Sequence, residues 1–149
     1  EVYILNNKNK GFTLAEMIIS VAILSVVSIY ILQMFLATKN LSIKSYEIDK
    51  SLRISKNIIE LISAGQGIEN SEDALLSKMR FEDGAYKLDF DSNFDLANEN
   101  NKLYTMTMSI KKEDGLNQID IEFTRLKPYI MKNESNVQIS SVSSTKRIQ

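Results

Sequence analysis

The sequence predicts an α+β fold, in which a long N-terminal helix packs by its second half on a small antiparallel sheet of three to four strands. Three observations lead to this expectation. An apolar run covers residues 12–36, residues 12–64 contain no glycine or proline, and short segments of alternating apolar and polar residues follow from residue 79. The first two patterns are typical of a continuous helix, and the third is typical of strands with one buried face.

Composition narrows the classes of function. The 149 residues suffice for one small domain and an anchor, and the net charge of −1 gives no indication of nucleic-acid binding. The chain has no cysteine and no histidine. Disulfides and cysteine-based zinc sites are therefore excluded, and the commonest general base is missing. We expect a protein that is not an enzyme, with no cofactor and no nucleic-acid partner.

The apolar run has the length and composition of a membrane-spanning helix. Residues 17–36 carry no charge, and as a helix they cover about 30 Å, the thickness of a bilayer core. A secretory signal peptide would have a shorter apolar region followed by a small-x-small cleavage site. A buried core helix would need more surrounding chain than this sequence offers. Lys8 and Lys10 precede the run and predict an N-terminus on the cytoplasmic side, with the polar remainder outside.

One carboxylate, Glu16, stands near the start of this run and needs an explanation, because a charge in a bilayer is costly. The hexapeptide Gly11-Phe12-Thr13-Leu14-Ala15-Glu16 follows a short basic leader and precedes the apolar helix. It resembles the prepilin-type N-terminal signal of type IV pilins and pseudopilins. The resemblance implies that a membrane-embedded prepilin peptidase cleaves between Gly11 and Phe12 and methylates the new amine of Phe12. It also implies that Glu16 meets the N-terminal amine of a neighbouring subunit during assembly.

The resemblance implies a structural subunit of a type IV pilus or a related filament. Its partners would be other pilin subunits, the prepilin peptidase, the inner-membrane assembly platform and membrane lipid. It would begin as a single-pass protein of the cytoplasmic membrane and end in a cell-surface pilus or pseudopilus. Ser25 and Gln33 stand where major pilins usually have glycine and proline, which favours a minor pilin or pseudopilin with an unbroken helix. A non-polymerising, membrane-anchored extracellular binding domain is the alternative.

Residues 37–64 should continue the helix, with Gly65 as its C-cap. Two apolar stripes are available to cover a sheet, Leu41/Ile48/Leu52/Ile59/Ile62 and Ile43/Tyr46/Ile54/Ile58/Leu61. Charged residues, Glu47 among them, fill much of the remaining surface. We therefore expect one apolar stripe to pack on the sheet and the other to pack on neighbouring subunits.

Strand patterns follow. Residues 79–81 and 85–91 flank Glu82-Asp83-Gly84, which predicts a hairpin, and two further alternating segments run through residues 104–111 and 119–124. The whole chain then divides into five parts: a leader (1–11), a transmembrane or filament-core helix (12–36), its amphipathic second half (37–64), a small antiparallel β-domain (65–130), and a polar tail or edge strand (131–149).

Four polar residues at alternate positions imitate the start of a calcium-binding EF-hand loop: Asp89, Asp91, Asn93 and Asp95. The match then fails, because Phe94 occupies the position that needs glycine and Asn100 the position of the bidentate glutamate. Alternating carboxylates are also what the solvated face of a strand looks like. We favour the solvated face and predict no metal site, with calcium at these four residues as the alternative.

Overall fold

A computed structural model describes residues 12–65, 68, 72–113 and 116–147. The chain forms two compact units, Glu1–Lys39 and Asn40–Gln149. One helix, α1 (Leu14–Ser63), extends through the boundary and contributes to both units. The short 3₁₀ helix η1 (Leu76–Lys78) and all the strands belong to the second unit.

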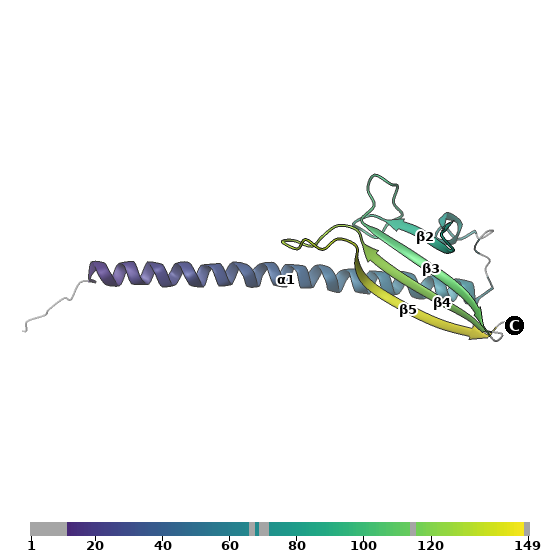
Figure 1. Ribbon diagram of the computed structural model, residues 1–149, viewed down its shortest axis with the longest axis horizontal. Coiled ribbons are helices and arrows are strands. Elements are labelled where there is room, and N and C mark those ends of the chain that lie inside the picture. Colours follow the sequence, from purple (N-terminus) through teal and green to yellow (C-terminus); the bar gives the residue numbers. More distant parts are fainter. Residues whose placement is uncertain (1–11, 66–67, 69–71, 114–115, 148–149) are drawn as a thin grey trace, which may run out of the picture. The chain divides into compact units, whose positions relative to one another are not determined.

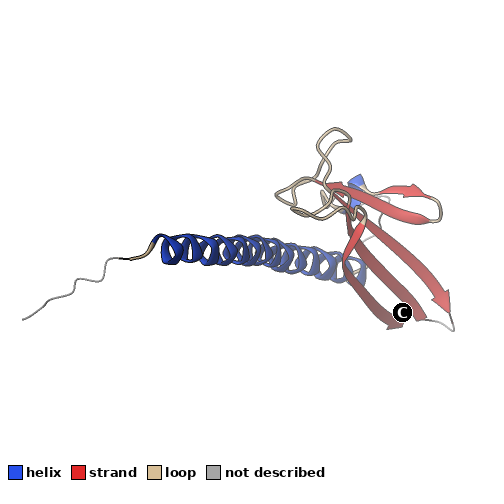
Figure 2. Cartoon of the chain, turned by 60° about the vertical axis from the view of Figure 1, so that its left-hand side comes forward, coloured by secondary structure: helices blue, strands red, loops and turns tan. Residues whose placement is uncertain are grey.

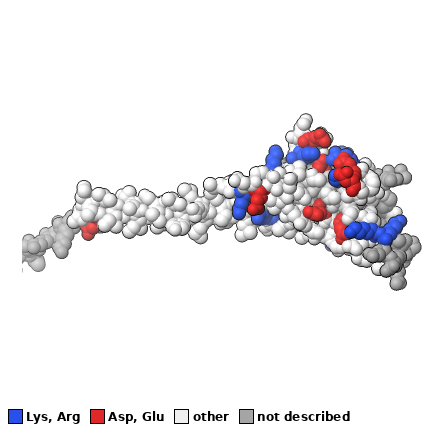
Figure 3. Space-filling view, viewed as in Figure 1, with Lys and Arg blue, Asp and Glu red and all other residues white. Residues whose placement is uncertain are grey.

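The N-terminal part of α1 is an exposed apolar helix. Within the described residues, α1 is the helix that is long and apolar enough to cross a membrane. On the face drawn in Figure 3, its N-terminal part is almost free of charged side chains. Its serine hydroxyls are satisfied within the helix, since Ser20, Ser25 and Ser28 each donate to the carbonyl four residues earlier, at 2.7 to 2.8 Å. The helix is unbroken from Ser25 to Gln33; its state in a filament stays a prediction.

The second unit contains a five-stranded antiparallel sheet in the order β1-β2-β3-β4-β5 (Figures 1 and 2). Its strands are β1 (Arg80–Glu82), β2 (Ala85–Phe90), β3 (Tyr104–Glu113), β4 (Leu116–Arg125) and β5 (Val137–Arg147).

The predicted number of three to four strands is wrong, because β5 adds a fifth. It forms from residues that were predicted to be either a polar tail or an edge strand. The segment is rich in serine and has only scattered apolar residues, so its alternation is weak. The segment becomes a strand because its backbone N–H and C=O groups pair with those of β4 along nearly its whole length. The pairing is interrupted by an irregularity at Phe123/Thr124.

Two glycine-containing backbone features, one turn and one helix end, lie where the sequence predicted them. Asp83 and Gly84 join β1 to β2 with φ of 54° and 80°, the positive values that a type I′ hairpin turn requires. Gly65 ends α1 with φ of 88°, as expected of a left-handed C-cap. The predicted hairpin and the predicted helix end are both confirmed.

The sheet buries one apolar face against α1. Its centre contains Phe90, Met106, Met108, Ile121 and Phe123, each at most 1 % exposed. These residues come from three neighbouring strands and form one cluster with Ile58 of α1. The alternation in the sequence therefore assigned the inward side of these strands correctly.

The helix face that covers the sheet mixes residues of the two predicted apolar stripes with polar residues. Ile54, Ile58 and Leu61 of the second stripe lie in or against the core cluster. The fully buried positions of α1 are Glu47, Ser51, Ser55 and Ile58, and three of these four are polar. Leu41 of the first stripe is exposed instead. The serines are small enough to let the helix approach the strands closely, and the Ser140 hydroxyl of β5 donates to Ser51 at 2.7 Å.

Candidate processing and assembly site

The start of α1 is closed by a reciprocal pair of hydrogen bonds. The Glu16 amide donates to the Thr13 hydroxyl at 3.2 Å, and the Glu16 carboxylate accepts from the Thr13 amide at 2.8 Å and from its hydroxyl at 3.0 Å. This is a capping box, in which two otherwise unpaired amides at a helix start are satisfied by side chains. The carboxylate also lies at the positive end of the helix dipole.

The predicted site residues surround this cap. Phe12 directly precedes it and is 80 % exposed. Gly11, the other half of the predicted cleavage site, lies outside the described residues. The capping role of Glu16 was missed, although the pattern Thr-x-x-Glu before an apolar run is a signature of it.

Comparison with known protein families finds a match in the N-terminal region of the chain. Residues 6–32 match the family described as the prokaryotic N-terminal methylation motif. The chain therefore carries a type IV pilin-like prepilin signal. The match covers the leader boundary, the cap and the first part of the apolar helix, and it does not extend to the sheet. No curated protein and no solved structure matches the chain.

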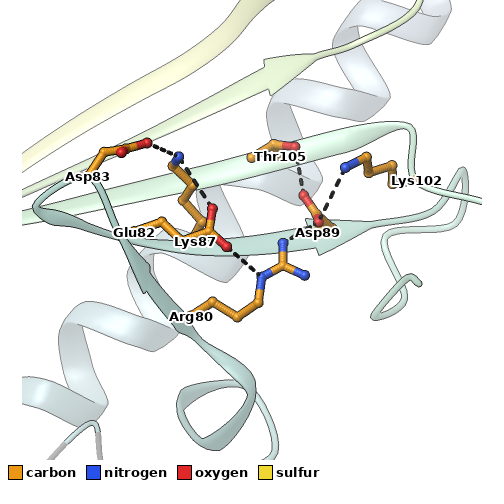
Figure 4. A network of polar contacts seen from close by, with 7 residues as sticks. All are labelled: Arg80, Glu82, Asp83, Lys87, Asp89, Lys102 and Thr105. Carbon is orange, nitrogen blue, oxygen red and sulfur yellow. Dashed lines mark hydrogen bonds and ion pairs between the residues drawn. The ribbon is translucent and has the colours of Figure 1, made fainter. Parts of the chain in front are cut away.

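The four residues considered for calcium binding lie outside the region of the prepilin signal, and they fall into two different structural environments. Asp89 lies in β2, almost completely buried, and its carboxylate accepts from Arg80 at 2.6 Å and from the Thr105 hydroxyl at 2.7 Å, with Lys102 at 3.9 Å (Figure 4). The hydrogen bond to Asp89 raises the pKa of Arg80 above its usual value. Asp89 is thus neutralised by the side chains of its own domain.

Asp91 instead organises the turn after β2. Its carboxylate accepts from the amides of Asn93 at 2.8 Å and Asp95 at 3.1 Å. Phe94 between them has φ of 65°, so the position at which an EF-hand needs glycine does adopt a glycine-like backbone. Its ring is buried and stacks on Tyr104 at 4.3 Å. In the described part of the chain, no three acidic side chains are grouped as a metal site would require.

Sequence reasoning also missed a buried cluster centred on Glu47. Its carboxylate accepts hydrogen bonds from the Tyr104 hydroxyl at 2.8 Å, the Arg125 guanidinium and the Tyr129 hydroxyl. Glu47 is 0 % exposed, whereas the sequence pattern placed it among the charged residues outside the two apolar stripes. Nothing in the spacing of these four residues marks them as partners, because they come from α1, two strands and a loop.

Electrostatics in this cluster favour neutral tyrosines beside an ion pair. Burial, and then the adjacent Glu47 carboxylate, raises the pKa of both Tyr104 and Tyr129 above the usual value. The Arg125 guanidinium lies over the Tyr129 ring at 4.6 Å, within the range of a cation–π contact. The cluster thus fixes α1 on the sheet through one carboxylate with three donors.

Proposed function

We propose that this protein is a structural subunit of a type IV pilus or a related filament, a minor pilin or pseudopilin. A prepilin peptidase cleaves it between Gly11 and Phe12 and methylates the Phe12 amine. It is held in the cytoplasmic membrane as a single-pass precursor and then enters a cell-surface filament. Other subunits, the assembly platform and membrane lipid are its partners.

The observation that carries this proposal is the prepilin signal at residues 6–32 at the head of an apolar helix whose side chains are exposed. Burying such a surface is strongly favourable, at about 25 cal/mol per Å² of apolar area. Among the described residues of the second unit, many apolar side chains pack in or against its own core. The helix therefore needs lipid before assembly and neighbouring helices after it.

Glu16 gives register to that assembly. Its carboxylate would pair with the methylated Phe12 amine of the next subunit, which offsets the cost of a charge in an apolar surrounding. The capping box supports this role because it holds the carboxylate at the first turn, close to where the mature N-terminus lies in the sequence. Ser25 and Gln33, with no helix breaker at either position, support the minor-subunit assignment over a major pilin.

Mass spectrometry of the membrane fraction tests the proposal. A mature chain that begins with N-methylated Phe12 is expected. Gly11→Ala should leave the leader attached, whereas the matched leader variant Asn9→Ala should be processed normally. An intact leader in the native protein would contradict the proposal and favour a membrane-anchored binding domain that does not polymerise.

A further inference from the structure

A small pocket lies beside the β1–β2 hairpin, inside the second unit. Its volume is about 270 Å³, which is below the range of about 300–1,000 Å³ that is typical of sites for small molecules. Its apolar lining residues are Leu88, Leu96 and Ala97. The loop that carries the last two is held on β2, since the Ala97 amide donates to the Asp89 carbonyl at 2.9 Å. The pocket is therefore preformed, and its size suits one side chain or one chain end.

Arg80 lines the pocket with a guanidinium that is already fixed in position. Its Nη2 donates to Asp89 at 2.6 Å, and its Nε lies 3.4 Å from Glu82 (Figure 4). The Asp89 side chain is only 4 % exposed and also accepts from the Thr105 hydroxyl at 2.7 Å. Arg80 itself remains 47 % exposed, and among the described residues it has no other acceptor. Because a guanidinium has five N–H groups, several of them remain available to a ligand.

Lys78 is the second cation of the pocket, and it is exposed at the end of η1. Within the described part of the chain it forms no ion pair. The hairpin acids Glu82 and Asp83 are held by Lys87 instead, at 3.5 and 2.9 Å (Figure 4). Lys78 therefore brings a positive charge that no described carboxylate neutralises by direct contact.

The acidic groups near Arg80 differ in their relation to the pocket. Asp89 lines it, whereas Glu82 and Glu99 are outside the lining. In raising the pKa of Arg80, Asp89 is the largest cause, followed by Glu82 and then Glu99. The lining thus contains two basic side chains and one carboxylate, which Arg80 already neutralises. An anion that enters the pocket meets a net positive charge.

The hairpin keeps Arg80 at a cost in stability. In the pairing of β1 with β2, Arg80 is directly opposite Lys87, and like charges at opposed positions are destabilising. Burying the Asp89 carboxylate is also unfavourable unless it is paired. Uncharged residues at positions 80 and 89 would avoid both penalties. Their presence favours a role for the guanidinium beyond joining two strands.

We propose that this pocket binds the C-terminal carboxylate of a peptide or protein partner, with the last side chain against Leu96 and Ala97. Arg80 donates two N–H groups to the carboxylate oxygens, and Lys78 adds a charge-assisted hydrogen bond. A guanidinium also fits phosphate, but an inorganic anion makes no use of the apolar lining. In a C-terminal residue the carboxylate and an aliphatic side chain branch from the same Cα, which matches cations and apolar residues in one small pocket. The proposal is independent of the proposed processing and filament assembly.

A nuclear magnetic resonance titration of the full chain in detergent micelles tests this binding. The probe is N-acetylalanine, which carries one methyl side chain and one carboxylate that is ionised at about pH 7. The amides of Ala97 and Asn98 should shift in a saturable way, with a dissociation constant on the order of 1 mM. N-acetylalaninamide has a similar shape without the charge and should produce no saturable shift. Inorganic phosphate should bind more weakly than N-acetylalanine.

Two substitutions test the assigned donors. Arg80→Gln removes the fixed guanidinium and should weaken binding about tenfold, as expected for loss of a charge-assisted hydrogen bond. Lys78→Gln should weaken binding about threefold, as expected for an exposed charge. Because Lys78 bonds no described residue, this variant leaves the hairpin intact and separates binding from folding. Arg53→Gln, which breaks an exposed ion pair with Asp49 at 2.9 Å, is the matched control and should bind the probe normally.

Any of three results overturns the proposal. One is the absence of saturable shifts at Ala97 and Asn98. Another is equal affinity for N-acetylalaninamide or phosphate, which would show that the pocket does not select a carboxylate on an aliphatic group. The third is native affinity in both Arg80→Gln and Lys78→Gln. None of these results bears on processing at Phe12, which mass spectrometry tests separately.

Discussion

Replacing Glu47 by glutamine tests how the helix is fastened to the sheet. The carboxylate is fully buried and accepts hydrogen bonds from Tyr104, Arg125 and Tyr129. Glutamine keeps the size of the side chain but removes its charge and turns one acceptor oxygen into a donor nitrogen. The Arg125 guanidinium, 12 % exposed, then loses its counter-charge inside the domain.

The expected cost follows from these contacts. Removing one partner of a buried ion pair costs about 3–5 kcal/mol. Arg125 retains some stabilisation, because it donates to the Lys127 carbonyl at 2.8 Å and lies over the Tyr129 ring. We therefore expect the lower end, about 3 kcal/mol, which lowers the midpoint of thermal unfolding by roughly 10 °C for a domain of this size.

Near-ultraviolet circular dichroism of the full chain in detergent micelles measures this loss. The chain has no tryptophan, so the signal reports chiefly tyrosine packing, including Tyr104 and Tyr129. Asp49→Asn is the matched control, since Asp49 forms an exposed ion pair with Arg53 at 2.9 Å and such pairs contribute about 0.2–1 kcal/mol. A midpoint for Glu47→Gln within about 2 °C of the native protein would refute the reasoning.

Three further outcomes can be checked by unfolding experiments on the same chain. Because the folded state raises the pKa of Tyr104 and Tyr129, stability should be unaffected by these groups below about pH 10 and fall above it, as thermal scans at alkaline pH would measure. Gly84→Ala should cost about 1 kcal/mol in urea unfolding, because φ of 80° is unfavourable for alanine. Asp89→Asn should cost about 2 kcal/mol by the same measurement, since it weakens the 2.6 Å contact with Arg80.

Local patterns in the sequence predicted much of the fold. The absence of glycine and proline from residues 12–64 predicted a single helix, and Gly65 predicted its end. Asp83-Gly84 predicted the first hairpin because few residue pairs tolerate two positive φ values. These features succeed because each depends on a few neighbouring residues, whose conformational preferences are intrinsic.

The remaining features depend on residues far apart in the chain. Glu47 looks like a solvent-facing acid, and only the convergence of Arg125, Tyr104 and Tyr129 explains its burial. β5 is similar, since its weak alternation becomes a strand through pairing with β4. Tertiary contacts override local propensity in both cases, and a single sequence contains no signal for them.

Thr13 and Glu16 allow the two roles of the first-turn carboxylate to be separated. Glutamine can still accept the Thr13 amide in a capping box, so Glu16→Gln removes the charge and keeps the cap. Thr13→Ala removes the hydroxyl of the cap, at a cost of about 1 kcal/mol in helix stability, and keeps the charge. If Glu16 pairs with the amine of a neighbouring subunit, the amount of subunit in purified filaments should fall for Glu16→Gln and stay near native for Thr13→Ala. Equal incorporation of Glu16→Gln and the native protein would show that the carboxylate acts as a helix cap alone.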